Sequence, residues 1–200
     1  MIIGLTGGIA TGKSQSSKIF KKLGCYIIDA DKLSRTLTAK DSKCLKEIVE
    51  RFGTDVLKND GTLDRKVLGK IVFNDKQSKI DLEQIIHPHI IRKTNEIITK
   101  KYNTANIIVD APLLFEVGLD RICDTVIVIY AQHHIQIDRF MKRDNISKEE
   151  AIKRIGLQMP IEDKMKLADI TIDNSGTLTE LKKKIEITYK KLMQNHKDLK

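Results

Sequence analysis

Gly7-Gly8-Ile9-Ala10-Thr11-Gly12-Lys13-Ser14 is the stretch that decides the fold of this 200-residue chain. It fits the phosphate-binding loop pattern G-x-x-x-x-G-K-[ST] at every specified position. The apolar run at residues 1–5 predicts a buried strand before the loop, and residues 13–23 have the spacing of a helix after it. Because strand, glycine loop and helix in this order are the context in which the motif works, a chance glycine-rich turn explains the match poorly.

The loop offers a complete cradle for a nucleotide's phosphates. Glycines let the backbone curl so that successive N–H groups point at one phosphate, and the helix N-terminus adds positive potential. Lys13 can reach the β and γ phosphates, and the Ser14 hydroxyl can bind Mg²⁺. The residues expected to bind the nucleotide here, which is ATP if the resemblance described below holds, are Gly8, Ala10, Thr11, Gly12, Lys13, Ser14 and Gln15.

Apolar runs separated by helical stretches predict an α/β fold of three layers. Further strands are expected at residues 25–29, 107–110, 125–130 and 170–172. They are apolar on both faces, as parallel strands covered on both sides should be. The interval 31–101 interrupts this alternation of strands and helices, because it shows only helical spacing, at 43–52, 64–73 and 76–100. We interpret it as an inserted helical lobe beside the phosphate loop.

Carboxylates follow two of the expected strands. Asp29 and Asp31 come directly after the second strand, where one of them could act as general base or orient Mg²⁺. The alternative for Asp31 is a helix N-cap. Asp110 ends an apolar strand, in the manner of the aspartate that binds Mg²⁺, usually through water, beside phosphate loops.

A second helical segment carries grouped cations. Gln136, Arg139 and Arg143 share one helix face, and Arg154 and Gln158 are expected on the next helix. Such arginines suit a lid that neutralises phosphoryl charge and excludes water, although by spacing alone exposed surface arginines are the simpler explanation. We therefore expect one domain over residues 1–200, with a core at about 1–30, 104–132 and 159–200, a lobe at about 31–103 and a lid at about 133–158.

Composition narrows the class of protein. The net charge of +9 comes from scattered basic residues, so a solvated lysine-rich surface is favoured over nucleic-acid binding. Three widely spaced cysteines predict buried thiols in a reducing compartment rather than disulfides or zinc ligands. The longest apolar run is too short to span a membrane, so we expect a cytoplasmic protein.

The histidine pairs are not expected to hold a metal, because no cysteine or carboxylate lies near them at ligand spacing. These pairs are His87 with His89 and His133 with His134. His87 is interpreted either as a substrate contact or as a cap at a helix break caused by Pro88.

Several segments together are more specific than a phosphate loop alone. They are residues 4–14, 28–31, 86–88 and 110–116 (Asp-Ala-Pro-Leu-Leu-Phe-Glu), followed by Gln136, Arg139, Arg143, Arg154, Gln158, Lys164, 168–169 and 172–174. With them the chain resembles the dephospho-CoA kinase family nearly from end to end. Two departures are Ala10, where the family often has glycine, and Gln15, where threonine is common. Ala10 should matter little unless it must adopt a positive φ.

The resemblance implies a P-loop fold like that of nucleoside monophosphate kinases, with a five-stranded parallel sheet, a helical CoA-binding lobe and a lid. It implies transfer of the γ-phosphoryl group of ATP to the ribose 3′-hydroxyl of dephospho-CoA, with Mg²⁺ and no nucleic-acid or membrane partner. Asp31 would be the general base, and Lys13 and Arg139 would stabilise the transferring group. His87, Leu113, Leu114, Phe115 and Glu116 would lie along the acceptor pocket, and Asp173 and Asn174 near the ATP base.

Three rival functions remain open from the residues. One is another small P-loop kinase with a different acceptor. A second is a GTPase switch, but the guanine-reading N-K-x-D pattern is absent. The third is a basic nucleic-acid-binding protein that uses ATP, which steep salt dependence would reveal. No pattern in the chain indicates its oligomeric state.

Overall fold

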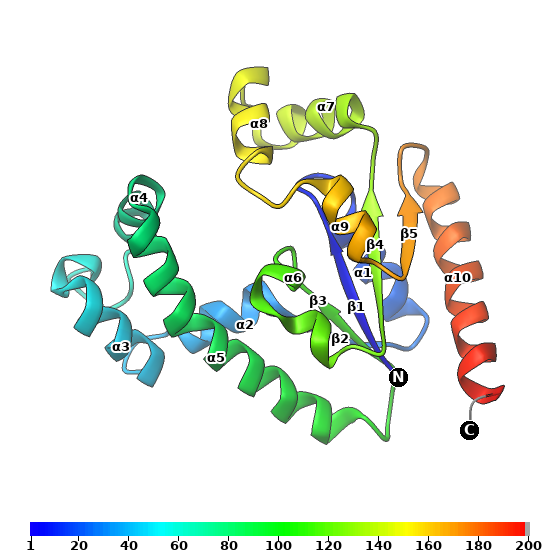
Figure 1. The fold of residues 1–200 in the computed structure, drawn as a ribbon, viewed down its shortest axis with the longest axis horizontal. Helices are drawn as coiled ribbons and strands as arrows, with labels where there is room; N and C mark the ends of the chain where they lie inside the picture. Colours follow the sequence, from blue (N-terminus) through cyan, green and yellow to red (C-terminus); the bar gives the residue numbers. More distant parts are fainter. Residues whose placement is uncertain (199–200) are drawn as a thin grey trace. The chain divides into compact units, whose positions relative to one another are not determined.

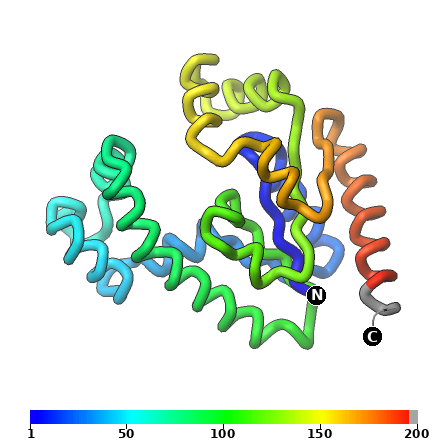
Figure 2. Tube along the Cα trace, in the orientation of Figure 1, coloured from blue at the N-terminus to red at the C-terminus, as the bar shows by residue number. Residues whose placement is uncertain are grey.

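The computed structural model describes residues 1–198, with side chains through residue 195. The chain divides into two compact units, one of Met1–Ile28 with the chain from Lys100 onward, and one of Asp29–Thr99. Figures 1 and 2 trace the chain from blue at the N-terminus to red near the C-terminus. In the part of the chain that is described, no helix is both long enough and apolar enough to cross a bilayer.

The first unit is built on a five-stranded sheet in the order β2-β3-β1-β4-β5 (Figure 1). Its strands are β1 (Ile2–Gly7), β2 (Tyr26–Asp29), β3 (Ile107–Asp110), β4 (Thr125–Tyr130) and β5 (Ile170–Asp173). Strand β1 pairs in parallel with β3 and β4, and β4 pairs in parallel with β5. The five expected strands and the α/β fold are thus confirmed.

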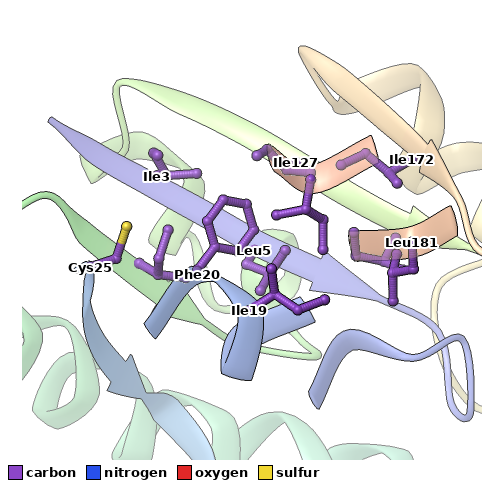
Figure 3. Close-up of a cluster of buried hydrophobic side chains, with 11 residues drawn as sticks. Ile3, Leu5, Ile19, Phe20, Cys25, Ile127, Ile172 and Leu181 are labelled. Atoms are coloured by element: carbon purple, nitrogen blue, oxygen red, sulfur yellow. The ribbon is translucent and has the colours of Figure 1, made fainter. Parts of the chain in front are cut away.

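Alternating residues of β1 face two different helical layers. Ile3 and Leu5 join an apolar cluster with Ile19 and Phe20 of α1 (Lys13–Lys22) and Leu181 of α10 (Leu178–Asp198), drawn in Figure 3. On the other side, a Cβ on Gly4 would come within 2.8 Å of Leu114, in α6 (Leu114–Val117). The remaining elements of this unit are the 3₁₀ turn η2 (Leu119–Ile122), α7 (His133–Asp144), α8 (Lys148–Ile155) and α9 (Ile161–Leu167). The sheet therefore lies between two helical layers, as the sequence predicted.

The second unit is helical. It holds α2 (Ala30–Leu37), α3 (Lys43–Phe52), the 3₁₀ turn η1 (Thr54–Val56), α4 (Arg65–Asn74) and most of α5 (Lys76–Lys101). Within residues 29–99 the only extended pairing described is an isolated bridge between Leu57 and Leu63. Its own core gathers Cys44, Leu45, Ile48, Val56, Leu63 and Leu68. The unit can therefore bury apolar surface within itself.

Two of the alternatives left open by the sequence, and one expectation, are wrong. Pro88 does not break the helix, because α5 continues through it from Lys76 to Lys101. Packing on both sides of the proline outweighs the one backbone hydrogen bond that it removes. Asp29 rather than Asp31 caps α2, since its side chain accepts from Lys32 N–H at 3.0 Å. Gln158 is not on the helix of Arg154, because α8 ends at Ile155.

The thiols fit the expectation in part. Cys25 and Cys44 are buried, whereas Cys123 is of intermediate exposure. Desolvation raises the pKa of Cys44 to about 11 and of Cys123 to about 12. Both side chains are therefore uncharged, unreactive thiols at neutral pH.

Candidate functional site

The phosphate loop closes on a glycine that no other residue can replace. Gly12 is the N-cap of α1 with φ of 98°. A Cβ on it would lie 2.0 Å from the Asn174 amide nitrogen. That amide donates to the Thr11 carbonyl at 2.8 Å, and Asn174 is 7% exposed. The segment after β5 thus holds the loop directly, which explains an asparagine at position 174.

Ala10 meets the condition under which it was expected to matter. Its φ is 58°, in the left-handed region. For a residue with a Cβ this conformation costs roughly 1–2 kcal/mol. Its side chain packs with Ile9 against a cluster formed by Ile137, Phe140 and Ala151 of α7 and α8. Burial of the methyl group is a compensation that glycine could not supply.

Lys13 and Asp110, which were assigned separately to the phosphates and to Mg²⁺, meet in the structure. The Lys13 ammonium pairs with one oxygen of the Asp110 carboxylate, which is 7% exposed. The Ser17 hydroxyl donates to the other oxygen. Ser17 was missed by the sequence analysis, although it lies four residues after Lys13 and hence on the same face of α1. Ser14, by contrast, is exposed.

A buried lysine supports the segment that follows Asp110. Lys164 of α9 is 0% exposed, and its ammonium donates to the Pro112 carbonyl at 2.5 Å. The same ammonium lies 3.0 Å from a Glu116 carboxylate oxygen. The Thr6 hydroxyl also donates to the Pro112 carbonyl, at 3.1 Å. These contacts fix the backbone between Asp110 and Glu116.

The side chains of that segment differ in exposure. Leu113 is 40% exposed, whereas Leu114 is 0% exposed and packs over Gly4. Phe115 and Glu116 are of intermediate exposure. Leu114 therefore holds the segment on the sheet.

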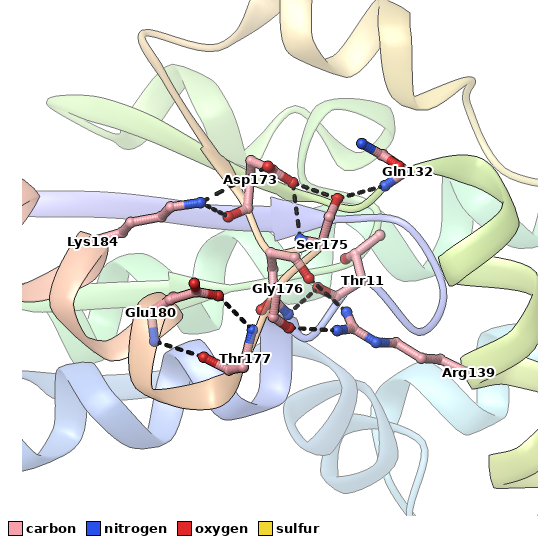
Figure 4. Close-up of polar contacts among 10 residues, drawn as sticks. Thr11, Gln132, Arg139, Asp173, Ser175, Gly176, Thr177, Glu180 and Lys184 are labelled. Atoms are coloured by element: carbon pink, nitrogen blue, oxygen red, sulfur yellow. Dashed lines mark hydrogen bonds and ion pairs between the residues drawn. The ribbon is translucent and has the colours of Figure 1, made fainter.

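The loop between β5 and α10 is a network of hydrogen bonds, shown in Figure 4. The Asp173 carboxylate accepts from the backbone N–H and the hydroxyl of Ser175, at 2.9 and 2.6 Å. These bonds, and then the charges of Lys184 and Arg139, lower the pKa of Asp173. Ser175 in turn accepts from Gln132 N–H at 3.0 Å, at the start of α7. Several hydrogen bonds thus hold the loop, and its Asp173 carboxylate favours the charged form.

Arg139 belongs to this same loop. Its guanidinium donates to the Asn174 carbonyl at 2.6 Å and to the Gly176 carbonyl at 3.0 Å (Figure 4). Arg143 instead pairs with Asp144 at 2.6 Å and lies 5.1 Å from the centre of the Phe140 ring. The structure therefore brings Arg139 together with Asp173 and Asn174, and leaves Arg143 on the surface.

Two expected acceptor-side residues lie in the second unit. Asp31 is exposed in the first turn of α2, and His87 is half-buried within α5. Another histidine was not expected to pack: His89 is 8% exposed, and its Nε2 lies 2.7 Å from the Glu47 carboxylate of α3. That contact links two helices of the unit.

Residues 1–180 match the family model described as dephospho-CoA kinase. The chain belongs to the dephospho-CoA kinase family. Curated relatives named dephospho-CoA kinase include one from Bacillus thuringiensis, 43% identical over 194 residues, which are 96% of each chain. Another, from Fusobacterium nucleatum, is 42% identical over 186 residues, or 93% of this chain and 95% of the relative.

Solved structures agree with the family assignment. The structure titled dephospho-CoA kinase from Campylobacter jejuni has a TM-score of 0.72 and 34% identity over 98% of both chains. A protein from Thermus thermophilus has a TM-score of 0.81 and 29% identity, over 96% of this chain and 97% of that one. The chain is accordingly a kinase of coenzyme A synthesis that phosphorylates dephospho-CoA with ATP.

Proposed function

We propose that this kinase transfers the γ-phosphoryl group of ATP to the ribose 3′-hydroxyl of dephospho-CoA, through the residue roles set out below. The observation that carries the proposal is the ion pair of Lys13 with Asp110 at a phosphate loop held by Asn174. Phosphoryl transfer needs positioned charge more than covalent chemistry, and these residues supply it.

The phosphate loop binds ATP. Backbone N–H groups of residues 10–14 and the start of α1 face the phosphates, and Lys13 leaves Asp110 to contact the β and γ groups. Asp173 and Asn174 lie beside the ATP base. Gln15 and Arg143 flank the nucleotide. Support comes from the network of hydrogen bonds that joins the β5–α10 loop to Thr11.

Ser14 and Asp110 are the residues that would hold Mg²⁺. Both are oxygen donors, Ser14 is exposed, and Asp110 already attracts a cation, Lys13. Among the described residues no three His, Cys, Asp or Glu side chains cluster as metal ligands. This fits Mg²⁺, which is usually held by one or two protein groups plus substrate phosphates. When bound, the ion neutralises phosphate charge.

The Asp29–Thr99 unit and the segment after β3 bind the acceptor. Asp31 accepts the proton of the 3′-hydroxyl as it attacks, and His87, Leu113, Phe115 and Glu116 contact dephospho-CoA, with Leu114 packing beneath them. Support comes from the exposed carboxylate of Asp31 at the start of α2 and from the fixed Pro112 carbonyl.

Arg139 stabilises the charge on the transferring group, within a lid at about 133–158. In this role its guanidinium exchanges backbone carbonyls for phosphoryl oxygens. The lid excludes water from the reaction. With ATP and dephospho-CoA as partners, we further infer that the enzyme works in the cytoplasm.

The test is ADP release with Mg²⁺ and ATP, with and without dephospho-CoA, together with identification of the product's 3′-phosphate. Lys13→Ala and Asp31→Asn should both abolish turnover, and Asp31→Asn should leave ATP affinity near that of the wild type. Wild-type turnover by Asp31→Asn would refute the base assignment. ATP binding without stimulation by dephospho-CoA would refute the acceptor.

A further inference from the structure

Ile9, at the tip of the phosphate loop, is hydrogen-bonded by glutamines at both its backbone N–H and its backbone carbonyl. Gln136 of α7 donates from its side-chain amide to the Ile9 carbonyl at 2.8 Å. Gln158, after α8, accepts from Ile9 N–H with its side-chain oxygen at 3.1 Å. Loop and lid are thus joined at a single residue, from the two ends of the lid segment.

The surroundings show that these contacts are built in. Gln136 is 2% exposed, and a Cβ on Gly8 would lie 2.8 Å from its amide nitrogen. Glycine at position 8 is therefore what lets the amide reach the loop. The Ile9 and Ala10 side chains pack into the apolar cluster of α7 and α8. Polar and apolar contacts thus fasten the same two loop residues to the same pair of helices.

Glutamine suits both positions for one chemical reason. A side-chain amide is a neutral donor and acceptor, so it can satisfy either half of a buried peptide group. A lysine or glutamate there would place a charge beside the phosphates. Losing either amide leaves a part-buried backbone group of Ile9 without its partner, which costs stability.

We propose that Gln136 and Gln158 form a glutamine clamp, a pair of positioning residues that makes the phosphate loop and the α7–α8 lid move as one body. Holding the Ile9 peptide also keeps Ala10 in its left-handed conformation, which directs the next N–H groups to the phosphates. Phosphate binding at the loop is thereby coupled to lid position. The kinetic part of this inference rests on the proposed function, whereas the contacts do not.

The first experiment compares Gln136→Leu, Gln158→Leu and the double variant. Backbone amide exchange of the peptide containing Ile9 to Thr11, without ligands, should be at least tenfold faster in each single variant. The kcat/KM for ATP should fall about tenfold in each. Because both side chains hold the backbone of one residue, Ile9, the kcat/KM of the double variant should fall by less than the product of the two single losses. Wild-type exchange in both single variants, or multiplicative losses, would overturn the clamp.

The second experiment uses one substitution at two positions. Gln158→Glu keeps an acceptor for Ile9 N–H and should restore exchange to within threefold of the wild type. Gln136→Glu places a carboxylate against the Ile9 carbonyl, so it should not restore protection. Its amide exchange at pH 8 should be at least as fast as that of Gln136→Leu. Gln132→Glu, exposed at the start of α7, controls for added charge. Gln158→Glu behaving like Gln158→Leu would contradict the assigned contact.

Folding and function are kept apart in these tests. Circular dichroism and thermal unfolding identify any variant that fails to fold. If a leucine variant fails to fold, the exchange rate of Gln158→Glu relative to the wild type tests the clamp instead. Should the wild type show no turnover of dephospho-CoA, the proposed acceptor would fail, while exchange at Ile9 would still test the clamp.

Discussion

Arg139 is the residue for which the contacts in the structure and the proposed role call for different partners. Two of its guanidinium donors bind the Asn174 and Gly176 carbonyls. If it stabilises the transferring group, its contacts must strengthen in the transition state. Arg139→Ala should therefore lower kcat more than it raises the KM for ATP, by about 10²-fold against less than tenfold. Steady-state kinetics with saturating dephospho-CoA measures both.

The control for that variant is Arg121→Ala, which removes an exposed arginine in η2 outside the site. It should leave both constants near the wild type. A raised KM with unchanged kcat in Arg139→Ala would make Arg139 a residue that binds ATP in the ground state by ordering the β5–α10 loop.

At the residue scale, the sequence predicted those functional residues whose side-chain type and position in a motif indicate their role. Lys13 and Asp110 were predicted because a motif and a strand end bring them to one edge of the sheet. The positive φ of Ala10 was recognised only as a condition, because its backbone is set by packing against α7 and α8. The partners of Ile9, Gln136 and Gln158, lie 127 and 149 residues away, and no local pattern encodes such contacts.

Among the elements, the segment after β3 depends on one buried lysine. Lys164→Met keeps most of the side-chain volume but removes the donor to the Pro112 carbonyl and the charge beside Glu116. It should lower the free energy of unfolding by about 1–3 kcal/mol. Urea denaturation at pH 7 measures this. If Glu116 is the group left unpaired, Glu116→Gln in the same chain should recover part of the loss; equal stability of Lys164→Met and wild type would contradict the argument.

The contact between α3 and α5 should make the second unit sensitive to acid. The hydrogen bond from His89, followed by the charges of His89, Lys43 and Arg92, lowers the pKa of Glu47 below its ordinary value of 4.5. A lowered folded-state pKa means that the stabilisation is complete above that ordinary value and is lost as the pH falls through the folded one. The wild type should therefore lose more stability between pH 5 and pH 3 than Glu47→Gln does.

Urea denaturation at pH 6, 5, 4 and 3 provides that comparison for both proteins. Glu83→Gln is the matched control, since Glu83 is paired with Lys79 on one face of α5 at 3.8 Å and shows no link to α3. Parallel stability curves for wild type and Glu47→Gln would show that the His89 contact contributes nothing.

Helix and strand positions were predicted well where the apolar periodicity was strong. They were predicted poorly where a single residue decided whether a helix begins, continues or ends. The strands and the helices at 43–52 and 76–101 follow from apolar spacing alone. Pro88 inside α5 and the end of α8 at Ile155 do not, because tertiary packing decides whether a helix tolerates a proline or stops. Asp29 rather than Asp31 is the cap because α2 begins at Ala30, directly after β2 ends at Asp29.

For the whole molecule, each unit has a core of its own, one around Phe20 and Leu181 and one around Ile48 and Leu68. If the two substrates bind to different sets of residues, hydrogen exchange should separate the two sets. ATP with Mg²⁺ should protect amides at residues 8–14 and 173–176 in the first unit. Dephospho-CoA alone should protect residues 110–116 and helices of the Asp29–Thr99 unit, because a ligand that binds only the folded form suppresses local opening where it contacts the chain.

The decisive comparison is each ligand alone against both together. Protection of the Asp29–Thr99 unit by ATP alone, with none added by dephospho-CoA, would assign that unit to the nucleotide and contradict the proposed acceptor lobe. CoA lacking the nucleotide portion, as pantetheine, serves as a control, since it cannot present the ribose to Asp31. If the glutamine clamp couples loop and lid, ATP protection should also extend across α7 in the wild type and shrink to the loop in Gln136→Leu, because the bond that carries loop order to the lid is then gone.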